Sequence, residues 1–243
     1  MDAIGVIPAR YGSTRFEGKV LADLLGKPVI QHVWENAMRA STLDDLVVAT
    51  DDVRILEAVR AFGGKAVMTA KEHRTGTDRL REVANPIDAK VVVNIQADEP
   101  LLHPSMIDDV VTPLLHNREL TITTLKKKIT DPEDLRNPNV VKVVTDKNGY
   151  ALYFSRSAIP FPRFHENVVF YKHIGLYAFT KDFLFTFTTL PTSALEGAEG
   201  LEQLRVLENG YRIKVVETQF DTIGIDTPED LERAREALAS RNI

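Results

Sequence analysis

Three cationic side chains, Arg10, Arg15 and Lys19, follow an apolar run at the N-terminus, in the glycine-containing segment "ARYGSTRFEGK". Forked guanidinium groups and a lysine ammonium can bind successive phosphates along an extended polyanion. If the apolar run is a strand of a parallel sheet, this segment is a loop at the edge where open α/β folds bind ligands. We therefore predict a triphosphate site here; the alternative is a solvated basic loop.

The familiar nucleotide-binding loops do not explain this segment. Gly12 and Gly18 enclose five residues, whereas a Walker A loop has four, and Lys19 is followed by Val20 rather than by Ser or Thr. No G-x-G-x-x-G fingerprint follows the apolar run either. A phosphate site in this loop therefore needs a different geometry.

Two aspartates at predicted strand-to-helix junctions could hold a metal ion. Asp98 lies just past an apolar run in "NIQADEP", and Asp226 lies just before a helix start in "TIGIDTPEDL". Mg²⁺ prefers hard oxygen ligands and usually takes one or two carboxylates together with substrate phosphates. Opposite the cationic loop, this pair would complete a site for a nucleotide and Mg²⁺. Taken singly, each aspartate is explained equally well by its favourable interaction with a helix N-terminus.

A third polar segment, "KEHRTGTDRL", leads into a predicted helix. Thr75, Gly76 and Thr77 are small enough to let backbone groups approach a flat ligand such as a base, and Arg79 could reach a phosphate. An ordinary helix start capped by Thr75 or Thr77 is an equal alternative.

Polar side chains in the later part of the chain give weaker signals. His173, Gly175 and Tyr177 share one face of a predicted strand, so His173 and Tyr177 could both address a ligand. A single histidine is more often structural than catalytic, and we assign His173 no general-base role. Glu202 and Gln203 lie on an amphipathic segment, where surface polarity is the default explanation.

Alternating apolar runs and amphipathic segments should position these residues. In chain order the first part reads as strand, helix, strand, helix and strand: "AIGVIPA", "VIQHVWENAMRA", "LDDLVVAT", "VRILEAVRAFG" and "GKAVMT". This order predicts parallel strands joined by right-handed crossovers, and "AKVVVNIQ" predicts a further central strand. From about residue 120 the pattern is β-rich, and Asn148-Gly149 between two alternating runs predicts a hairpin. We expect an α/β fold with a mostly parallel sheet, helices on both faces and an antiparallel middle section.

The C-terminal part returns to helices. "ALEGAEGLEQLRVLENG" predicts a helix, and "RIKVVE" predicts a strand. The last helix should begin at Thr227 as N-cap, with Pro228 in the first turn and Asp230 completing a capping box. Four leucines of the first of these helices are expected in the core: Leu195, Leu201, Leu204 and Leu207.

Composition excludes several classes of protein. The 243 residues are 44% hydrophobic, enough for one large domain spanning residues 1–243. The net charge of −5 argues against a protein that coats nucleic acid or anionic membranes. The absence of cysteine excludes disulfides, thiolate metal sites and cysteine nucleophiles. With no signal-like start and no long apolar run, we expect a soluble cytoplasmic protein.

Eight motifs, spread over nearly the whole chain, resemble those of one family. They are "IPARYGSTRFEGK", "ATDD", "TGTDR", "NIQADEP", "ALYFSRSAIPF", "KHIGLYAF", "LEQLRVLENG" and "DTPEDLE". In this order they resemble the 3-deoxy-manno-octulosonate cytidylyltransferases, also called CMP-Kdo synthetases. The resemblance implies transfer of CMP from CTP to 3-deoxy-manno-octulosonate (Kdo) with release of pyrophosphate, in lipopolysaccharide biosynthesis.

The resemblance also implies a Rossmann-like nucleotidyltransferase fold, Mg²⁺ dependence and a homodimer. The β-rich section at about 120–190 would then serve both dimerisation and sugar binding. Motif by motif, it implies a triphosphate grip at Arg10, Arg15 and Lys19, with Lys19 also catalytic. It implies a base-reading loop at Thr75, Gly76 and Thr77 and Mg²⁺ ligands at Asp98 and Asp226. The implied sugar-pocket residues are Gln96, Arg156, His173, Tyr177, Glu202 and Gln203.

Two departures from the family pattern concern the nucleotide site. The first loop has Glu17 and Val20 where prolines are expected, and "NIQADEP" has Ala97 where glycine is usual. Neither departure removes a charged group. Two alternatives to the implied function remain: a cytidylyltransferase for another acidic sugar, such as the 8-amino analogue of Kdo, or a nucleotide-binding module without catalysis.

Overall fold

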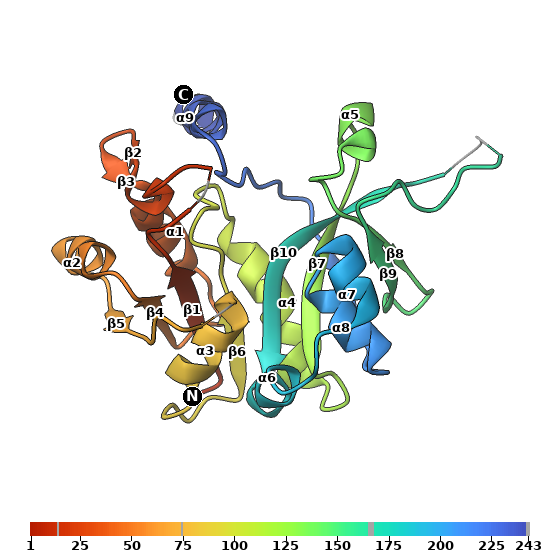
Figure 1. The fold of residues 1–243 in the computed structure, drawn as a ribbon, viewed down its shortest axis with the longest axis horizontal. Helices are drawn as coiled ribbons and strands as arrows, with labels where there is room; N and C mark the ends of the chain where they lie inside the picture. Colours follow the sequence, from red (N-terminus) through yellow and green to blue (C-terminus); the bar gives the residue numbers. More distant parts are fainter. Residues whose placement is uncertain (14, 74, 165–167, 242–243) are drawn as a thin grey trace.

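A mixed sheet with strand order β11-β7-β10-β6-β1-β4-β5 runs through the molecule (Figure 1). The structure is a computed structural model, and it describes residues 1–13, 15–73, 75–164 and 168–241. The strands are β1 (Ala3–Ala9), β2 (Asp23–Leu24), β3 (Lys27–Pro28), β4 (Asp45–Thr50), β5 (Ala66–Met68), β6 (Val91–Asn94), β7 (Ile122–Lys128), β8 (Lys142–Thr145), β9 (Ala151–Ser155), β10 (Tyr171–Thr180) and β11 (Lys214–Glu217). The α-helices are α1 (Val29–Ala37), α2 (Val53–Ala61), α3 (Gly76–Ala84), α4 (Pro104–His116), α5 (Pro132–Arg136), α6 (Lys181–Phe187), α7 (Ala194–Glu199), α8 (Gln203–Glu208) and α9 (Pro228–Arg241). A short 3₁₀ helix, η1, spans Lys19–Leu21.

Strand directions confirm a mostly parallel sheet. β1 pairs in parallel with both β4 and β6, and β4 pairs in parallel with β5. β10 is antiparallel to β6 and to β7, and β11 is parallel to β7. Along this path β10 therefore runs against the other strands. The carboxyl ends of β1, β4 and β6 meet at one edge, where polar loops begin.

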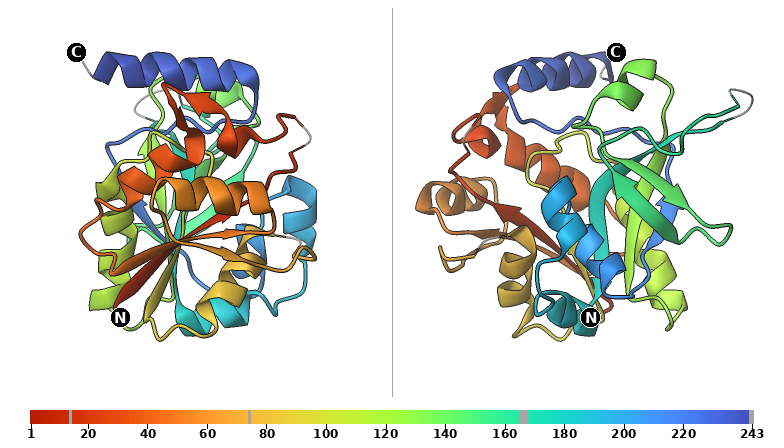
Figure 2. Two further views of the ribbon diagram at one scale, coloured as in Figure 1. Left: turned by 90° about the vertical axis from the view of Figure 1, so that its left-hand side faces the viewer. Right: turned by 45° about the vertical axis from the view of Figure 1, so that its right-hand side comes forward.

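Helices cover both faces of the sheet, as predicted. Helices α1, α2 and α4 pack on one face, and helices α3, α6 and α8 pack on the other. The alternation of side chains along β1 feeds both cores, since Ile7 belongs to the first and Val6 to the second. A smaller core joins α9 to the β2–β3 hairpin at one end of the molecule (Figure 2).

Two local predictions are confirmed. The turn between β8 and β9 is a hairpin in which Asp146 Oδ1 accepts a hydrogen bond from the Asn148 amide at 2.8 Å, and Gly149 has φ 76°. At the start of α9, Thr227 Oγ1 accepts from the Asp230 amide at 3.3 Å, while Asp230 Oδ2 accepts from the Thr227 amide at 3.0 Å. These two reciprocal hydrogen bonds between Thr227 and Asp230 form the predicted capping box.

The predicted helix after residue 193 is instead two short helices, α7 and α8. Gly200, with φ 62°, ends α7 in the left-handed conformation and redirects the chain. Leu201 and Leu204 are buried as predicted, but Leu195 is 38% exposed, so its predicted place in the core is wrong. The break at Gly200 shifts the apolar face, which a single helical period could not anticipate.

Candidate active site

The loop after β1 lines a cavity of about 460 Å³ at the carboxyl edge of the sheet. Arg10, Arg15 and Lys19 all line it, so the structure brings the three predicted cations to one site. Arg10 also donates a hydrogen bond to the backbone carbonyl of His73, which links this loop to the segment before α3.

The two predicted aspartates converge on Lys19 in the same cavity. Lys19 Nζ lies 2.5 Å from Asp98 Oδ2 and 2.9 Å from Asp226 Oδ1. Arg15 Nη2 lies 2.9 Å from Asp226 Oδ2. The predicted meeting of the cationic loop with two distant acids is therefore confirmed as a spatial arrangement.

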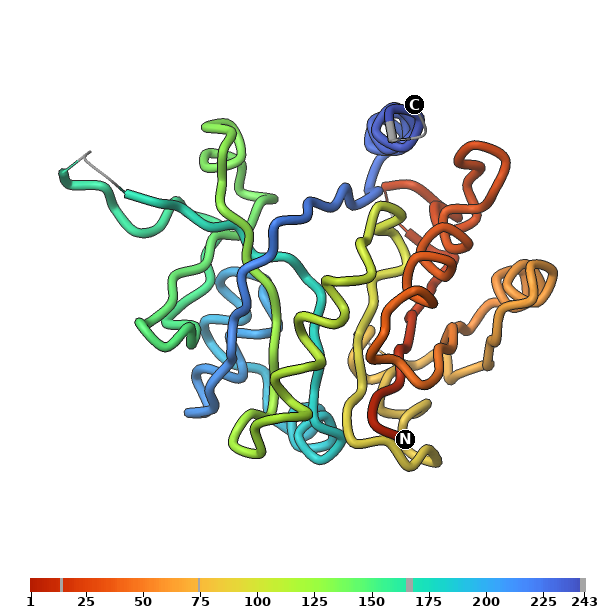
Figure 3. The backbone as a smooth tube through the Cα atoms, turned by 180° about the vertical axis from the view of Figure 1, so that it is seen from behind, coloured from red at the N-terminus to blue at the C-terminus, as the bar shows by residue number. Residues whose placement is uncertain are grey.

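The path of the chain after β11 explains how Asp226 reaches this cavity. This segment crosses from the β-rich part of the molecule to the part that contains β1, where α9 begins (Figure 3). The amide of Ile225 donates a hydrogen bond to the carbonyl oxygen of Asp98 at 2.9 Å. One backbone contact thus fixes the two carboxylates next to each other.

Electrostatics keep Lys19 charged. Burial alone would lower the pKa of Lys19, but the Coulombic attraction of Asp98 and hydrogen bonds to Asp98 and Asp226 outweigh it and raise the pKa. The Lys19 side chain is only 14% exposed. The ammonium is therefore a fixed positive charge throughout the neutral pH range.

The donor set of the cavity fits Mg²⁺ as the resemblance implies. Asp98 and Asp226 present carboxylate oxygens that already converge on one cation, the ammonium of Lys19. Within the described parts of the chain, no group of three or more His, Cys, Asp or Glu residues could hold a metal ion. A metal ion held by two carboxylates would take its other ligands from phosphate oxygens and water, as Mg²⁺ commonly does.

The start of α3 forms part of the opposite wall. Thr75 caps the helix by a capping box with Asp78, in which each side chain accepts a backbone hydrogen bond at 3.2 Å. Gly76 lines the cavity, and Thr77 Oγ1 donates to Glu202 Oε2 at 2.8 Å. The capping alternative therefore holds for Thr75, while Gly76 alone of this group faces the large cavity.

Arg79 does not reach this cavity. Its side chain is fully buried, with Nη2 2.7 Å from Asp51 Oδ2 and Nη1 donating to Thr69 Oγ1. This arrangement contradicts the predicted phosphate contact. The guanidinium serves instead as the buried partner of a carboxylate at the end of β4.

A second, smaller pocket of about 80 Å³ adjoins the large cavity. Gln96 lines both, so the end of β6 separates the two spaces. Tyr177, Glu202 and Gln203 line the small pocket, as does Thr77. Burial raises the pKa of Glu202 above its ordinary value, and burial together with nearby Glu202 raises that of Tyr177. Four predicted sugar-pocket residues thus lie together.

Comparisons with known proteins agree with this geometry. A family model described as cytidylyltransferase matches residues 4–214. The 3-deoxy-manno-octulosonate cytidylyltransferase of Geotalea daltonii is 52% identical over 99% of this chain and 100% of its own length. That of Geobacter sulfurreducens is 53% identical over 98% of this chain and 100% of its own length. The chain belongs to the 3-deoxy-manno-octulosonate cytidylyltransferase family.

Solved structures place this cytidylyltransferase in the same fold. A CMP:2-keto-3-deoxy-manno-octonic acid synthetase complexed with CTP superposes with a TM-score of 0.95 at 44% identity, covering 99% of this chain and 100% of the other. A cytidylyltransferase from Leptospira borgpetersenii has a TM-score of 0.67 at 15% identity, covering 99% of this chain and 87% of the other, and so shows the fold alone. The predicted nucleotidyltransferase fold is confirmed.

In this cytidylyltransferase His173 lies behind the small pocket and is not part of its lining. Its ring packs edge-on against Phe154 and 5.4 Å from the ring of Tyr177, and its Nε2 lies 2.9 Å from Thr124 Oγ1. Burial lowers the pKa of His173 to about 3. The imidazole is therefore neutral at neutral pH, and its ring lies beside that of Tyr177.

Arg156 is placed differently from the other predicted sugar-pocket residues. Its Nε donates to the carbonyl of Glu199 at 2.7 Å, and its Nη1 donates to the carbonyl of Pro138 at 3.0 Å. Arg156 lines neither the large cavity nor the small pocket. In this structure it ties the end of β9 to the C-terminus of α7, and a contact with the sugar stays a prediction.

Sequence reasoning missed Asn94, which is buried and lines the small pocket. The signal was available, because Asn94 and Gln96 are two positions apart and so share one face of an extended segment. Ala97, the departure from the family pattern, is 5% exposed and lines the large cavity. Its methyl group therefore takes up space beside the proposed nucleotide site.

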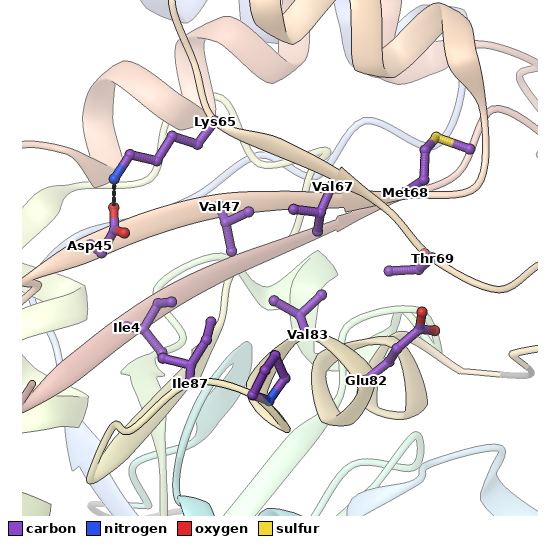
Figure 4. A pocket seen from close by; sticks show the side chains of 11 residues that line it. Ile4, Asp45, Val47, Lys65, Val67, Met68, Thr69, Glu82, Val83 and Ile87 are labelled. Carbon is purple, nitrogen blue, oxygen red and sulfur yellow. Dashed lines mark hydrogen bonds and ion pairs between the residues drawn. The ribbon is translucent and has the colours of Figure 1, made fainter.

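A third cavity, of about 400 Å³, lies between β4, β5 and α3 and differs in chemistry (Figure 4). Aliphatic side chains such as Val47, Val67 and Val83 line it, and an ion pair of 2.6 Å between Lys65 and Asp45 lies at its side. It lacks the clustered cations and carboxylates of the large cavity.

In the described ranges, no helix combines the length and apolar character needed to span a membrane.

Proposed function

We propose that this chain transfers CMP from CTP to the anomeric hydroxyl of Kdo, with release of pyrophosphate. The observation that carries the proposal is the cluster of Lys19, Asp98 and Asp226 beside two arginines, in a cavity that adjoins a polar pocket at Gln96. Full-length identity of 52% to a named relative supports the same reaction.

Charge assigns a role to each side of the large cavity. Arg10, Arg15 and Lys19 bind the triphosphate, and Arg15 and Lys19 neutralise the charge that develops on the leaving pyrophosphate. The sugar oxygen forms a bond to the α-phosphorus as the bond from that phosphorus to the pyrophosphate oxygen breaks. The hydroxyl proton is released to solvent.

Mg²⁺ is the proposed cofactor, and Asp98 and Asp226 are its proposed protein ligands. When bound, such an ion supplies Lewis-acid catalysis and lowers the pKa of a nearby hydroxyl. The side chains of the protein itself position the two substrates. Gln96, Tyr177, Glu202 and Gln203 orient the sugar in the small pocket, because holding two substrates in line removes much of the entropic part of the barrier.

The cellular setting and assembly are part of the same proposal. We propose that the product serves lipopolysaccharide biosynthesis, that the reaction takes place in the cytoplasm and that the working form is a homodimer. Both substrates are small polar molecules, in keeping with two polar cavities.

The test is pyrophosphate release from CTP, Mg²⁺ and Kdo, measured with a coupled phosphate assay and parallel detection of the CMP-sugar. We expect release that depends on all three components. A parallel reaction with the 8-amino analogue of Kdo decides between the two sugars by the ratio of kcat/KM. If neither sugar gives pyrophosphate although CTP binds, the chain is a nucleotide-binding module and the proposal is wrong.

A further inference from the structure

The first loop closes on itself immediately before Lys19. The Gly18 amide donates a hydrogen bond to the Tyr11 carbonyl at 2.9 Å, which brings the two ends of the loop together. Gly18 is the N-cap of η1, and Lys19 is the first residue of this helix. The backbone position of Lys19 therefore depends directly on the closure between Tyr11 and Gly18.

The ring of Tyr11 packs against the backbone of Gly18. A Cβ atom placed on Gly18 would lie 3.0 Å from Tyr11 Cζ and 3.1 Å from both Cε2 and Oη. Gly18 also has φ 69°, a conformation that side-chain-bearing residues rarely adopt. The close approach of ring and backbone thus requires glycine here, and the ring defines where Gly18 can lie.

An arginine from α2 stacks on the same ring. Arg54 Cζ lies 3.2 Å from the centroid of the Tyr11 ring. Its guanidinium is held by Asp52, with Nε 2.9 Å from Oδ1 and Nη2 2.6 Å from Oδ2. Asp52 is itself fixed as the N-cap of α2. A two-point contact of this kind orients the guanidinium plane, which favours stacking on an aromatic face.

We propose that Tyr11, Asp52 and Arg54 form a clasp that holds the first loop closed and so positions Lys19 for the triphosphate of CTP. The inference rests on the proposed function. None of the three lines the large cavity or the small pocket, so they act through Gly18 and Lys19 as positioning residues.

Asp51, which precedes Asp52 in the turn after β4, supports the opposite wall of the large cavity. Asp51 pairs with the buried Arg79 of α3, and Gly76 at the start of α3 lines the cavity. The turn after β4 therefore braces both the cationic loop, through Asp52, and the start of α3, through Asp51. This arrangement gives the "ATDD" segment a role in the site, although neither aspartate lines the large cavity.

Steady-state kinetics of four single variants test the clasp. We expect Tyr11→Leu and Arg54→Ala each to raise the KM for CTP by about threefold to tenfold, the range expected for loss of one cation–π contact. The KM for Kdo should change by less than about twofold, because the small pocket is untouched. Tyr11→Phe should keep the wild-type KM for CTP, since it retains the ring. Arg60→Ala, an exposed arginine on the same helix, is the matched control and should behave as wild type.

The double variant Tyr11→Leu/Arg54→Ala separates a clasp from two independent contacts. Its KM for CTP should be close to that of the more impaired single variant, because either change alone opens the clasp. All assays are run well below the unfolding midpoint of each variant, so that stability alone does not change the KM values. Equal increases in both KM values, an unchanged KM for CTP, or a Phe variant as impaired as the Leu variant would each overturn the proposal.

Failure of the proposed function is distinguishable from failure of the clasp. If the wild-type chain releases no pyrophosphate, binding of CTP and Mg²⁺ measured by calorimetry takes the place of KM. We then expect the same order of CTP affinities among the variants, and equal affinities would contradict the clasp. A catalytically active wild type with unaffected variants contradicts the clasp alone.

Discussion

Lys19 joins the cationic loop to both carboxylates of the large cavity. Its ammonium contacts both Asp98 and Asp226, and burial of its side chain strengthens these interactions by excluding water. The oxygen atoms of the two carboxylates thus converge on one cationic group, the Lys19 ammonium. The two carboxylates therefore offset part of the positive charge that Arg10, Arg15 and Lys19 bring to the cavity.

Removal of one carboxylate should greatly reduce turnover without unfolding the chain. We expect Asp98→Asn to reduce kcat at saturating Mg²⁺ and CTP by at least about a hundredfold, because the variant loses the negative charge of a proposed Mg²⁺ ligand. Its thermal unfolding midpoint should remain close to that of the wild type, because Lys19 keeps Asp226 as a partner. Asp88→Asn, an exposed aspartate remote from the cavity, is the control. A near-normal rate for Asp98→Asn would show that Asp98 is not a metal ligand.

At the scale of single elements, the sequence predicts strands and caps better than it predicts side-chain partners. The hairpin at Asn148-Gly149 and the capping box at Thr227 could be predicted because both depend on a few adjacent residues. The single helix predicted after residue 193 failed because Gly200 breaks it, although the leucines keep a helical spacing on both sides. Local signals therefore fixed where elements lie more reliably than where they end.

In the candidate site too, the positions of loops could be predicted better than the partners of single side chains. The cavity lining at Arg15 and Lys19 could be predicted, because loops after parallel strands gather at one edge of the sheet. Asp226 is predicted from its place before a helix start, and it reaches the same edge through the segment after β11. The burial of Arg79 on α3 could not, since it depends on Asp51 in the turn after β4, 28 positions away. Asn94 could have been predicted from the face that it shares with Gln96, but the apolar run "VVVNIQ" around it is typical of a buried strand.

The Arg79–Asp51 pair joins α3 to the end of β4, and its loss should be costly for the fold. We expect Asp51→Ala to lower the free energy of unfolding by about 3–5 kcal/mol, because it leaves a fully buried guanidinium without its counter-charge. The double variant Arg79→Met/Asp51→Leu should recover most of this loss, since no buried charge remains. Urea denaturation measures both.

The neighbouring aspartate provides the control for this prediction. Asp52→Ala removes the N-cap of α2 and an exposed ion pair, and should cost only about 1 kcal/mol. Equal losses for Asp51→Ala and Asp52→Ala, or a double variant less stable than Asp51→Ala, would mean that the buried pair is not the origin of the effect.

At the scale of the whole molecule, the fold assembles the site from the two ends of the chain. Lys19 and Asp226 are 207 positions apart, and the segment after β11 must cross the sheet edge to bring them together. The part of the molecule beyond β9 exposes apolar side chains. Beyond β9 the chain extends away from the sheet as an arm (Figure 1), on which Phe161 is 85% exposed and Phe164 is 78% exposed. Two exposed phenylalanines on one projecting segment are typical of a surface that another molecule covers.

A second copy of the chain is the partner that the proposed homodimer would place on this arm. We expect the wild type to sediment at twice the 27.2 kDa of one chain and Phe161→Ser/Phe164→Ser to shift toward the monomer, because the variant loses the largest exposed apolar groups of the arm. Val67→Ser is the matched control, since Val67 is 40% exposed on β5 at the other end of the sheet. Analytical ultracentrifugation over a range of concentrations measures the dissociation constant of each form. A wild type that is monomeric at all concentrations contradicts the dimer, whereas an arm variant that dimerises as tightly as Val67→Ser contradicts only the arm as its interface.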